Sequence, residues 1–287
     1  MNHVDLHMHS TCSSDGTYTP SELMELCARA GLTTVALTDH NSARGVEEAA
    51  ARAQALGIRL IPGIELDCVC QGVSIHLLGY GIRTEDATLY QVEEEVLKKE
   101  QKTSAERMRL VKETGIVFDG SFVLKNAWNG VVTGEMIGEA ALREDCNRSH
   151  PLMKELYPGG SRSDNPFVNF YWDVCAPGKP AFVPVEYMAF EEAQRLIEKL
   201  GGISVIAHPG QNIGRRPELV QYMREQGVSG LEVYSSYHTL EQVRYYEELA
   251  DHLGLKKTAG SDFHGKTKPA VKLGVMPGLE GKEKWLE

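Results

Sequence analysis

The chain has 287 residues, of which 42% are hydrophobic, enough to fill a large core, and this argues against a disordered chain. Its 30 lysines and arginines against 40 acidic residues give a formal net charge of -10. This charge argues against broad binding to nucleic acid or to anionic membranes unless bound cations reverse the local sign. Six cysteines lack a zinc-finger spacing and no signal peptide or long apolar segment occurs, so we expect a reduced, cytoplasmic protein with no membrane contact.

Apolar runs rich in Val, Ile and Leu are predicted as seven strands, separated by amphipathic helices. The strands cover residues 4–9, 34–40, 60–67, 73–80, 203–208, 230–235 and 256–264. The helices cover residues 21–30, 44–56, 191–200 and 240–253, and a glycine follows each of them as a C-cap. Strands that alternate with helices in this way predict an α/β fold with a parallel sheet, and the chain length favours a barrel.

The stretch from about residue 83 to residue 182 interrupts this alternation. It contains a charged helix over residues 91–115, a second helix over 133–146, and a segment over 147–180 rich in Gly, Pro, Ser and Asn. We therefore predict a mainly helical inserted subdomain, residues 83–182, that lies over one mouth of a barrel formed by residues 1–82 and 183–287. The terminal Leu286-Glu287 pair is assigned no function.

Metal-binding residue types recur where the predicted strands end. His7 and His9 are two residues apart on the first strand, so they share a face and can close on one ion. The other candidates are Asp15, His40, Glu65, His76, His208, Asp262 and His264. Because the carboxyl ends of parallel strands gather at one mouth of a barrel, all nine residues should converge there.

The nine candidate ligands exceed what one ion requires. Imidazole with carboxylate suits manganese, zinc or iron, and the absence of cysteine argues against a closed structural zinc site. We therefore expect two to three divalent metal ions. Several ions close together would lower the pKa of a shared water and bind phosphoryl oxygens, which favours hydrolysis of phosphate esters.

The same residues carry a family resemblance that spans nearly the whole chain. The motifs are His7-Met8-His9-Ser10-Thr11 with Ser14-Asp15-Gly16, Ala36-Leu37-Thr38-Asp39-His40, Ile61-Pro62-Gly63-Ile64-Glu65, His76-Leu77-Leu78-Gly79-Tyr80, Val205-Ile206-Ala207-His208-Pro209-Gly210 and Ala259-Gly260-Ser261-Asp262-Phe263-His264-Gly265. Their order resembles that of the PHP (polymerase and histidinol phosphatase) family, in its stand-alone branch similar to nucleoside bisphosphate phosphatases and small-RNA trimming enzymes. The resemblance implies a distorted (β/α)7 barrel, amidohydrolase-like, with up to three ions.

The resemblance also implies how the ligands divide among the ions. One ion would lie on His7, His9, Glu65 and Asp262, and Glu65 would bridge to a second ion on His76 and His208. A third ion would lie on Asp15, His40 and His264. Glu65 and Asp262 are thus expected in catalysis around a metal-bridging hydroxide. His238 follows a predicted strand end and is a candidate to donate a proton or bind phosphate.

Two departures from this branch bear on the substrate. Its members usually carry an Arg and a His in the segment that here reads Val132-Thr133-Gly134-Glu135-Met136-Ile137, and an Arg where this chain has Gln211. The substrate is therefore expected to differ from the nucleotide of the nearest relatives. Candidate substrate-binding residues are Arg107, Lys179, Tyr18 and Arg148, with Arg215 and Arg216 as further cations, and for each cation the alternative is a solvated surface charge.

We expect a metal-dependent phosphoesterase acting on a small phosphorylated metabolite, either a phosphomonoester or a small or cyclic diester hydrolysed sequentially. Alternatives are a nucleotide or oligoribonucleotide phosphatase or exonuclease like the nearest relatives, a non-catalytic metal-binding regulatory module, and an amidohydrolase acting on a C–N bond. A degenerate module would lose ligands, and none is lost here. No stable nucleic-acid complex is expected, and the sequence does not determine the oligomeric state.

Overall fold

The computed structural model describes residues 3–280, so the Leu286-Glu287 pair lies outside the described residues. The strands are β1 (Val4–Asp5), β2 (Thr34–Leu37), β3 (Arg59–Cys70), β4 (Val73–Tyr80), β5 (Met188–Ala189), β6 (Ile203–Ile206), β7 (Gly230–Ser235) and β8 (Lys256–Gly260). The α-helices are α1 (Pro20–Arg29), α2 (Val46–Leu56), α3 (Ala87–Glu113), α4 (Gly120–Asn126), α5 (Gly134–Ala141), α6 (Pro166–Phe170), α7 (Phe190–Lys199), α8 (Pro209–Asn212), α9 (Pro217–Glu225) and α10 (Leu240–Leu253). Short helical turns are η1 (Asp145–Ser149), η2 (Lys154–Leu156), η3 (Tyr171–Cys175) and η4 (Gly265–Thr267).

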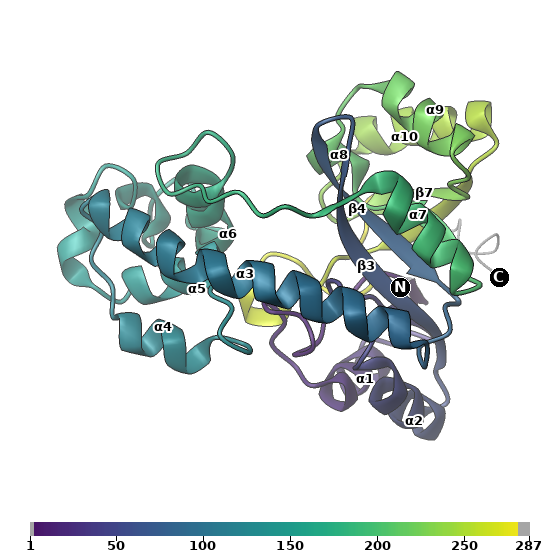
Figure 1. The fold of residues 1–287 in the computed structure, drawn as a ribbon, viewed down its shortest axis with the longest axis horizontal. Helices are drawn as coiled ribbons and strands as arrows, with labels where there is room; N and C mark the ends of the chain where they lie inside the picture. Colours follow the sequence, from purple (N-terminus) through teal and green to yellow (C-terminus); the bar gives the residue numbers. More distant parts are fainter. Residues whose placement is uncertain (1–2, 281–287) are drawn as a thin grey trace.

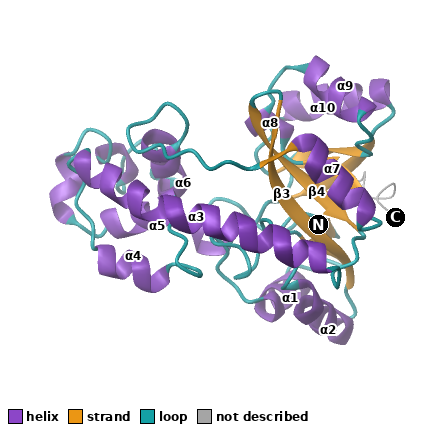
Figure 2. Cartoon of the chain, in the orientation of Figure 1, coloured by secondary structure: helices purple, strands orange, loops and turns teal. Residues whose placement is uncertain are grey.

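Seven strands form a barrel-shaped sheet in the order β1-β2-β3-β4-β6-β7-β8, and β5 adds to β3 (Figure 2). The chain after β8 returns to the chain after β1, where the Leu6 N–H donates to Ala259 O at 2.9 Å and Met8 bridges to Phe263. This contact nearly closes the barrel. The predicted fold class, a distorted seven-stranded α/β barrel, is confirmed.

The expectation of a wholly parallel sheet is wrong at β4. This strand runs antiparallel to both β3 and β6, because a two-residue turn at Gln71 and Gly72 joins it directly to β3. Both turn residues have positive φ, 48° and 79°, as a type I′ hairpin turn requires. Glu65 and His76 therefore lie within paired strands rather than at strand ends.

Alternation along the hairpin explains why its polar residues still reach the mouth of the barrel. On β4, Ile75 and Leu77 pack in the large outer core, whereas Leu78 and Tyr80 pack with the cluster between the strands. His76 shares the face of Leu78, and its paired residue on β3 is Asp67. Because the two strands run in opposite directions, the start of β4 lies beside the end of β3, at the same mouth.

The part of the chain between β4 and β5 is helical and has a hydrophobic cluster of its own, which includes Val111, Ile137, Phe170 and Val174. Figure 1 shows α3 running from the barrel into this part and an extended segment returning from it to β5. The predicted second helix ends earlier than expected, at Ala141, and η1 follows it. The division at residues 83 and 182 stays a prediction. Among the described helices, none combines the length and the apolar character needed to cross a membrane.

Candidate metal centre

All nine predicted ligand residues meet at one mouth of the barrel. Their nitrogen and oxygen atoms fall into four overlapping groups, each with atoms within 4.8 Å of one another. The groups are His7, His9, Glu65 and Asp262; Glu65, His76 and His208; His9, Asp15, His40 and His264; and His40, Asp67 and His76. Strand ends and the β3–β4 hairpin thus bring residues more than 250 positions apart in sequence into contact.

Glu65 lies at the centre of the cluster and is fully buried. Its Oε2 is 3.0 Å from His7 Nε2, 3.1 Å from His9 Nε2 and 3.4 Å from His40 Nδ1. Its Oε1 is 2.9 Å from His76 Nδ1 and 3.2 Å from His208 Nε2. One carboxylate therefore faces five imidazoles, the arrangement expected of a group shared between ions.

Protein partners hold the outward nitrogen of four histidines of the cluster. His7 Nδ1 donates to Glu232 Oε1 at 2.9 Å and His9 Nδ1 to Ser13 Oγ at 3.1 Å. His208 Nδ1 donates to Asn212 Oδ1 at 2.9 Å, and His264 Nδ1 to the carbonyl of Asp262 at 2.9 Å. Each ring is thereby oriented with its Nε2 toward the cluster, which is how outer partners orient histidines for metal binding.

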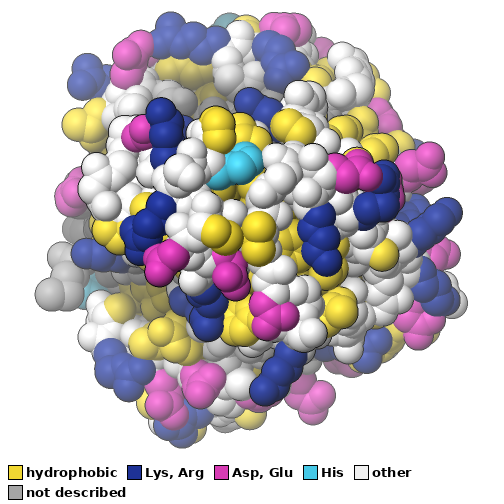
Figure 3. Space-filling view, turned by 90° about the vertical axis from the view of Figure 1, so that its left-hand side faces the viewer, with side chains coloured by type: hydrophobic (Ala, Val, Ile, Leu, Met, Phe, Trp, Pro, Cys, Tyr) yellow, Lys and Arg dark blue, Asp and Glu magenta, His cyan; other side chains and the backbone are white. Residues whose placement is uncertain are grey.

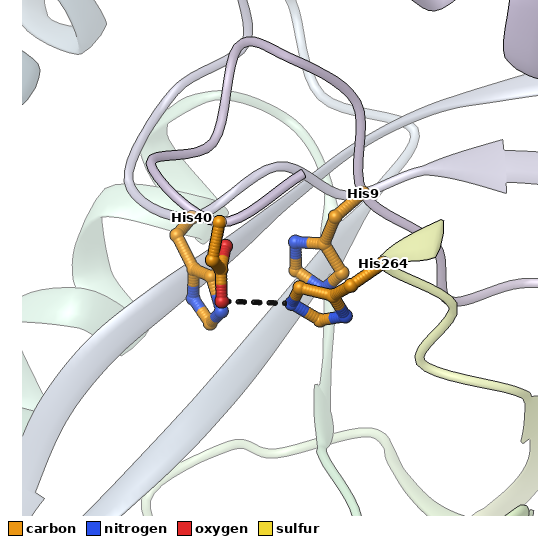
Figure 4. Close-up of side chains that lie close together, drawn as sticks. His9, His40 and His264 are labelled. Atoms are coloured by element: carbon orange, nitrogen blue, oxygen red, sulfur yellow. Dashed lines mark ion pairs between the residues drawn. The ribbon is translucent and has the colours of Figure 1, made fainter. Parts of the chain in front are cut away.

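The far end of the cluster is built around Asp15. His264 Nε2 lies 3.1 Å from Asp15 Oδ2, and the rings of His9 and His264 stack at 3.9 Å (Figure 4). The loop that carries Asp15 folds back so closely that a Cβ at Gly16 would lie 1.8 Å from the Ser10 carbonyl oxygen. Only glycine fits there, so Gly16 is what allows Asp15 to reach the histidines.

Five buried side-chain atoms that face the cluster have no hydrogen-bond partner within residues 3–280. They are His9 Nε2, Asp15 Oδ1, His40 Nδ1, Asp262 Oδ1 and His264 Nε2. An unsatisfied buried polar atom costs about 1–3 kcal/mol, so this concentration at one site needs a compensating ligand. Nitrogen and carboxylate oxygen donors together fit manganese, zinc or iron.

Burial and neighbouring charges shift the pKa values of the cluster in opposite directions. Burial alone would lower the pKa values of His7 and His40, but Glu65 with Glu232 and Asp262 raises the pKa of His7, and Glu65 with Asp67 that of His40, well above the usual range. Burial, together with His264 and His40, lowers the pKa of His9 to about 4, so its ring is neutral at pH 7. Burial alone would raise the pKa values of Glu65 and Asp262. The facing histidines hold the pKa of Glu65 well below its usual range, and Lys268 with His264 and His7 does so for Asp262.

Four residues of the site were not predicted from the sequence. Asp67 Oδ1 lies 3.3 Å from His40 Nδ1 and 3.2 Å from His76 Nε2, and Lys268 and Tyr237 both reach Asp262. Glu232 lies behind His7. The sequence does contain a signal for two of them. Asp67 is two positions after Glu65, on the same face of its strand, and Glu232 is the lone acid in an apolar strand. The positions of Lys268 and Tyr237 depend on loop geometry and gave none.

His238 lies outside the cluster. Its Nδ1 donates to the carbonyl of Val233 at 2.8 Å, and its Nε2 accepts from the Gly210 N–H at 3.0 Å. Burial lowers the pKa of this side chain, in keeping with a neutral ring. Both ring nitrogens are engaged by backbone, so the geometry offers no nitrogen for proton donation to a substrate and makes His238 a brace between β7 and the turn after His208.

The predicted substrate-binding residues occupy different environments. Arg107 is half-buried and donates to the Val132 carbonyl, and Tyr18 stacks on Phe263 next to the Asp15 loop. Lys179 is exposed, and Arg148 pairs with Asp145 and lies over the ring of Tyr157. Arg215 pairs with Glu241, and Arg216 donates to backbone carbonyls.

A hollow of about 250 Å³ opens beside Asp15, between the Ser10–Thr17 loop and the helical part. Its wall includes Asn126, Trp128, Met136, Phe167 and Lys266.

The face of the helical part shown in Figure 3 carries basic and acidic side chains interspersed with apolar ones. This face therefore lacks the continuous basic character that a long nucleic-acid track requires.

A family model for the PHP domain matches residues 5–124. The chain is similar to a 3',5'-nucleoside bisphosphate phosphatase of Chromobacterium violaceum, with 32% identity over 92% of this chain and 88% of the relative. It is 28% identical to a phosphoribosyl 1,2-cyclic phosphate 1,2-diphosphodiesterase of Eggerthella lenta, over 91% of this chain and 94% of the relative. It is also 28% identical to a 5'-3' exoribonuclease of Haemophilus influenzae, over 91% of this chain and 89% of the relative.

Among solved structures, the fold is similar to that of an amidohydrolase from Chromobacterium violaceum with bound sulfate and no metal. The TM-score is 0.77 with 27% sequence identity, covering 94% of this chain and 91% of that one.

Proposed function

This chain belongs to the PHP family and is a phosphoesterase of the metal-dependent type, and we propose that its substrate is a small phosphorylated metabolite. The observation that carries this proposal is the set of inward-facing donor atoms without hydrogen-bond partners around Glu65. We further propose a cytoplasmic location, since none of the six cysteines is paired.

The proposed ligand sets follow the groups seen in the cluster. His7, His9, Glu65 and Asp262 would hold one ion, Glu65, His76 and His208 a second, and Asp15, His40 and His264 a third. When bound, divalent ions of this kind lower the pKa of water and neutralise the charge of phosphoryl oxygens. All nine ligand positions are retained and face one another, which argues against the non-catalytic module.

The protein residues supply orientation and charge around the reacting phosphate. Glu232, Ser13 and Asn212 fix the tautomers of three histidines. Lys268 and Tyr237 place a cation and a hydroxyl at the outer oxygen of Asp262, within the mouth. These groups suit a phosphoryl oxygen, and they would replace the basic residues missing at residues 132–137 and at Gln211. His238 is left out of the proposed catalytic set.

The size and charge of the site favour a compact substrate. The hollow beside Asp15 can take one organic group, with Trp128 and Phe167 as apolar walls. The first two relatives act, by their names, on a nucleoside bisphosphate and a phosphoribosyl cyclic phosphate, both small. The exoribonuclease relative supports the alternative of an oligoribonucleotide substrate, which the net charge of -10 disfavours.

The test is a substrate panel with the purified protein in manganese. The panel contains an aryl phosphate, a bis-aryl phosphodiester, an amide chromogen, a nucleoside 3',5'-bisphosphate, a ribosyl cyclic phosphate and a 5'-phosphorylated oligoribonucleotide. We expect turnover of the small phosphate esters that is abolished by a chelator and restored by the metal. Preference for the oligoribonucleotide or the amide would overturn the proposed substrate class.

A further inference from the structure

The carboxylate of Glu232 lies directly behind two of the metal-binding histidines. Its Oε1 accepts from His7 Nδ1 at 2.9 Å, and its Oε2 accepts from the backbone N–H of His208 at 2.7 Å. Glu232 is fully buried in the middle of β7, and its ion pair within the described residues is with His7. One buried side chain therefore holds a ring from β1 and a backbone from the end of β6.

The two histidines that Glu232 holds face the same carboxylate on their other side. His7 Nε2 lies 3.0 Å from Glu65 Oε2, and His208 Nε2 lies 3.2 Å from Glu65 Oε1. Their rings are stacked, with centroids 5.4 Å apart and planes inclined by 21°. Glu65 therefore contacts both imidazoles in front, whereas Glu232 contacts the His7 ring and the His208 backbone behind. The two histidines belong to different proposed ions.

The backbone around this contact is under constraint. His208 has φ 22° and ψ 61°, a conformation that L-residues with side chains disfavour, and the bond from its N–H to Glu232 holds it there. On β8, a Cβ at Gly260 would lie 2.4 Å from Glu232 Oε1 and 2.2 Å from His7 Cβ. Glycine at 260 is therefore what lets the His7–Glu232 pair pass between the strands.

We propose that Glu232 is a positioning residue that links the two proposed ion positions, because it holds the His7 ring of one and the His208 backbone of the other. This inference rests on the proposed metal centre. A carboxylate that accepts from the outer nitrogen of a ligating histidine fixes its tautomer and raises its basicity, and loss of such a partner typically costs 10–100-fold in metal affinity.

Glu232→Gln is the informative substitution because it keeps volume and shape. An amide has one acceptor where two donors must be satisfied. If the amide oxygen accepts from His7, its NH2 group faces the His208 N–H and two donors oppose each other. If the oxygen accepts from His208 instead, the NH2 group faces His7, whose proton must then move to Nε2, and the ring loses the lone pair that faces the cluster. We expect manganese affinity, measured by competition with a metallochromic chelator, to fall about 10–100-fold, with both ions weakened together.

The matched control is Glu191→Gln on α7, which removes a carboxylate that accepts from Tyr222. It should leave manganese affinity unchanged. If Glu232→Gln lowers the melting temperature equally with chelator and with manganese and leaves metal affinity at the wild-type value, Glu232 is only a structural residue and the inference is wrong. If the wild type itself binds no divalent metal, the proposed function fails instead.

Discussion

Lys268 forms a buried ion pair with Asp262 on the side of that carboxylate that faces away from the histidines. Lys268 Nζ lies 2.7 Å from Asp262 Oδ2, which also accepts from the Tyr237 hydroxyl at 2.6 Å. The other oxygen, Oδ1, is 3.2 Å from His7 Nε2 and 3.0 Å from His9 Nε2. One oxygen of Asp262 thus faces the proposed metal-binding histidines, and the other is held by the lysine.

This geometry predicts that Lys268→Met raises KM for a phosphomonoester by about tenfold, because a charge-assisted hydrogen bond to phosphate is lost. Lys268→Arg should retain most of the affinity, since it keeps the charge. Steady-state kinetics and metal analysis of both variants provide the measurement. An unchanged KM with reduced metal content would mean that Lys268 serves only to orient Asp262.

Glu65→Gln should reduce kcat by more than about 1000-fold, a barrier increase of about 4 kcal/mol. A neutral amide cannot present two charged oxygens to the five imidazoles around it. Asp67→Asn is the comparison, because Asp67 faces only His40 and His76 within the cluster and should lose far less activity. A Glu65→Gln enzyme with more than a tenth of the wild-type rate would contradict a bridging role.

Asp15→Asn should selectively remove the ion at the His40 and His264 end, since an amide is a poorer ligand than a carboxylate for a hard cation. Elemental analysis after growth in manganese is expected to fall from about three ions per chain to about two. Glu65 lies outside this group, so the remaining ions should stay. Loss of all metal from the variant, or a wild-type content near one, would refute the division into separate ion positions.

Arg107→Ala should raise KM for the physiological substrate more than for a small aryl phosphate, with kcat nearly unchanged, because a contact made equally in ground and transition states affects binding alone. Arg148→Ala serves as the control. Its guanidinium is largely exposed, pairs with Asp145 and lies over Tyr157. Equal responses of the two variants would make Arg107 an ordinary structural cation that holds Val132.

Glu100 predicts a pH dependence of stability. Burial, with Asp67 nearby, raises the pKa of this carboxyl from 4.5 to about 7 in the folded protein. Between these values the folded state keeps a proton that the unfolded chain releases, so stability falls as pH rises and the full loss is present above pH 7. Glu100→Gln can still accept from Tyr187 and should melt several degrees higher than wild type at pH 8, but at nearly the same temperature at pH 4. A stabilisation that does not depend on pH would exclude this titration.

The sequence by itself determined the fold class and the set of candidate ligands. His7 and His9 share a face because strand side chains alternate, and Asp15, His40, His208, Asp262 and His264 follow strands whose ends a barrel gathers at one mouth. Both arguments use local periodicity and strand order, which residue types reveal directly.

Only the tertiary structure decided how those ligands are supported. The Gln71-Gly72 turn reverses β4 and so places His76 beside Asp67, which strand counting alone does not reveal. Glu232 and Lys268 acquire their roles from residues more than 200 positions away or across a loop, and His238 is removed from the site by two backbone contacts. Such roles depend on distances of about 3 Å between elements remote in sequence, and hydrogen-bond geometry at that scale follows from packing rather than from any local pattern.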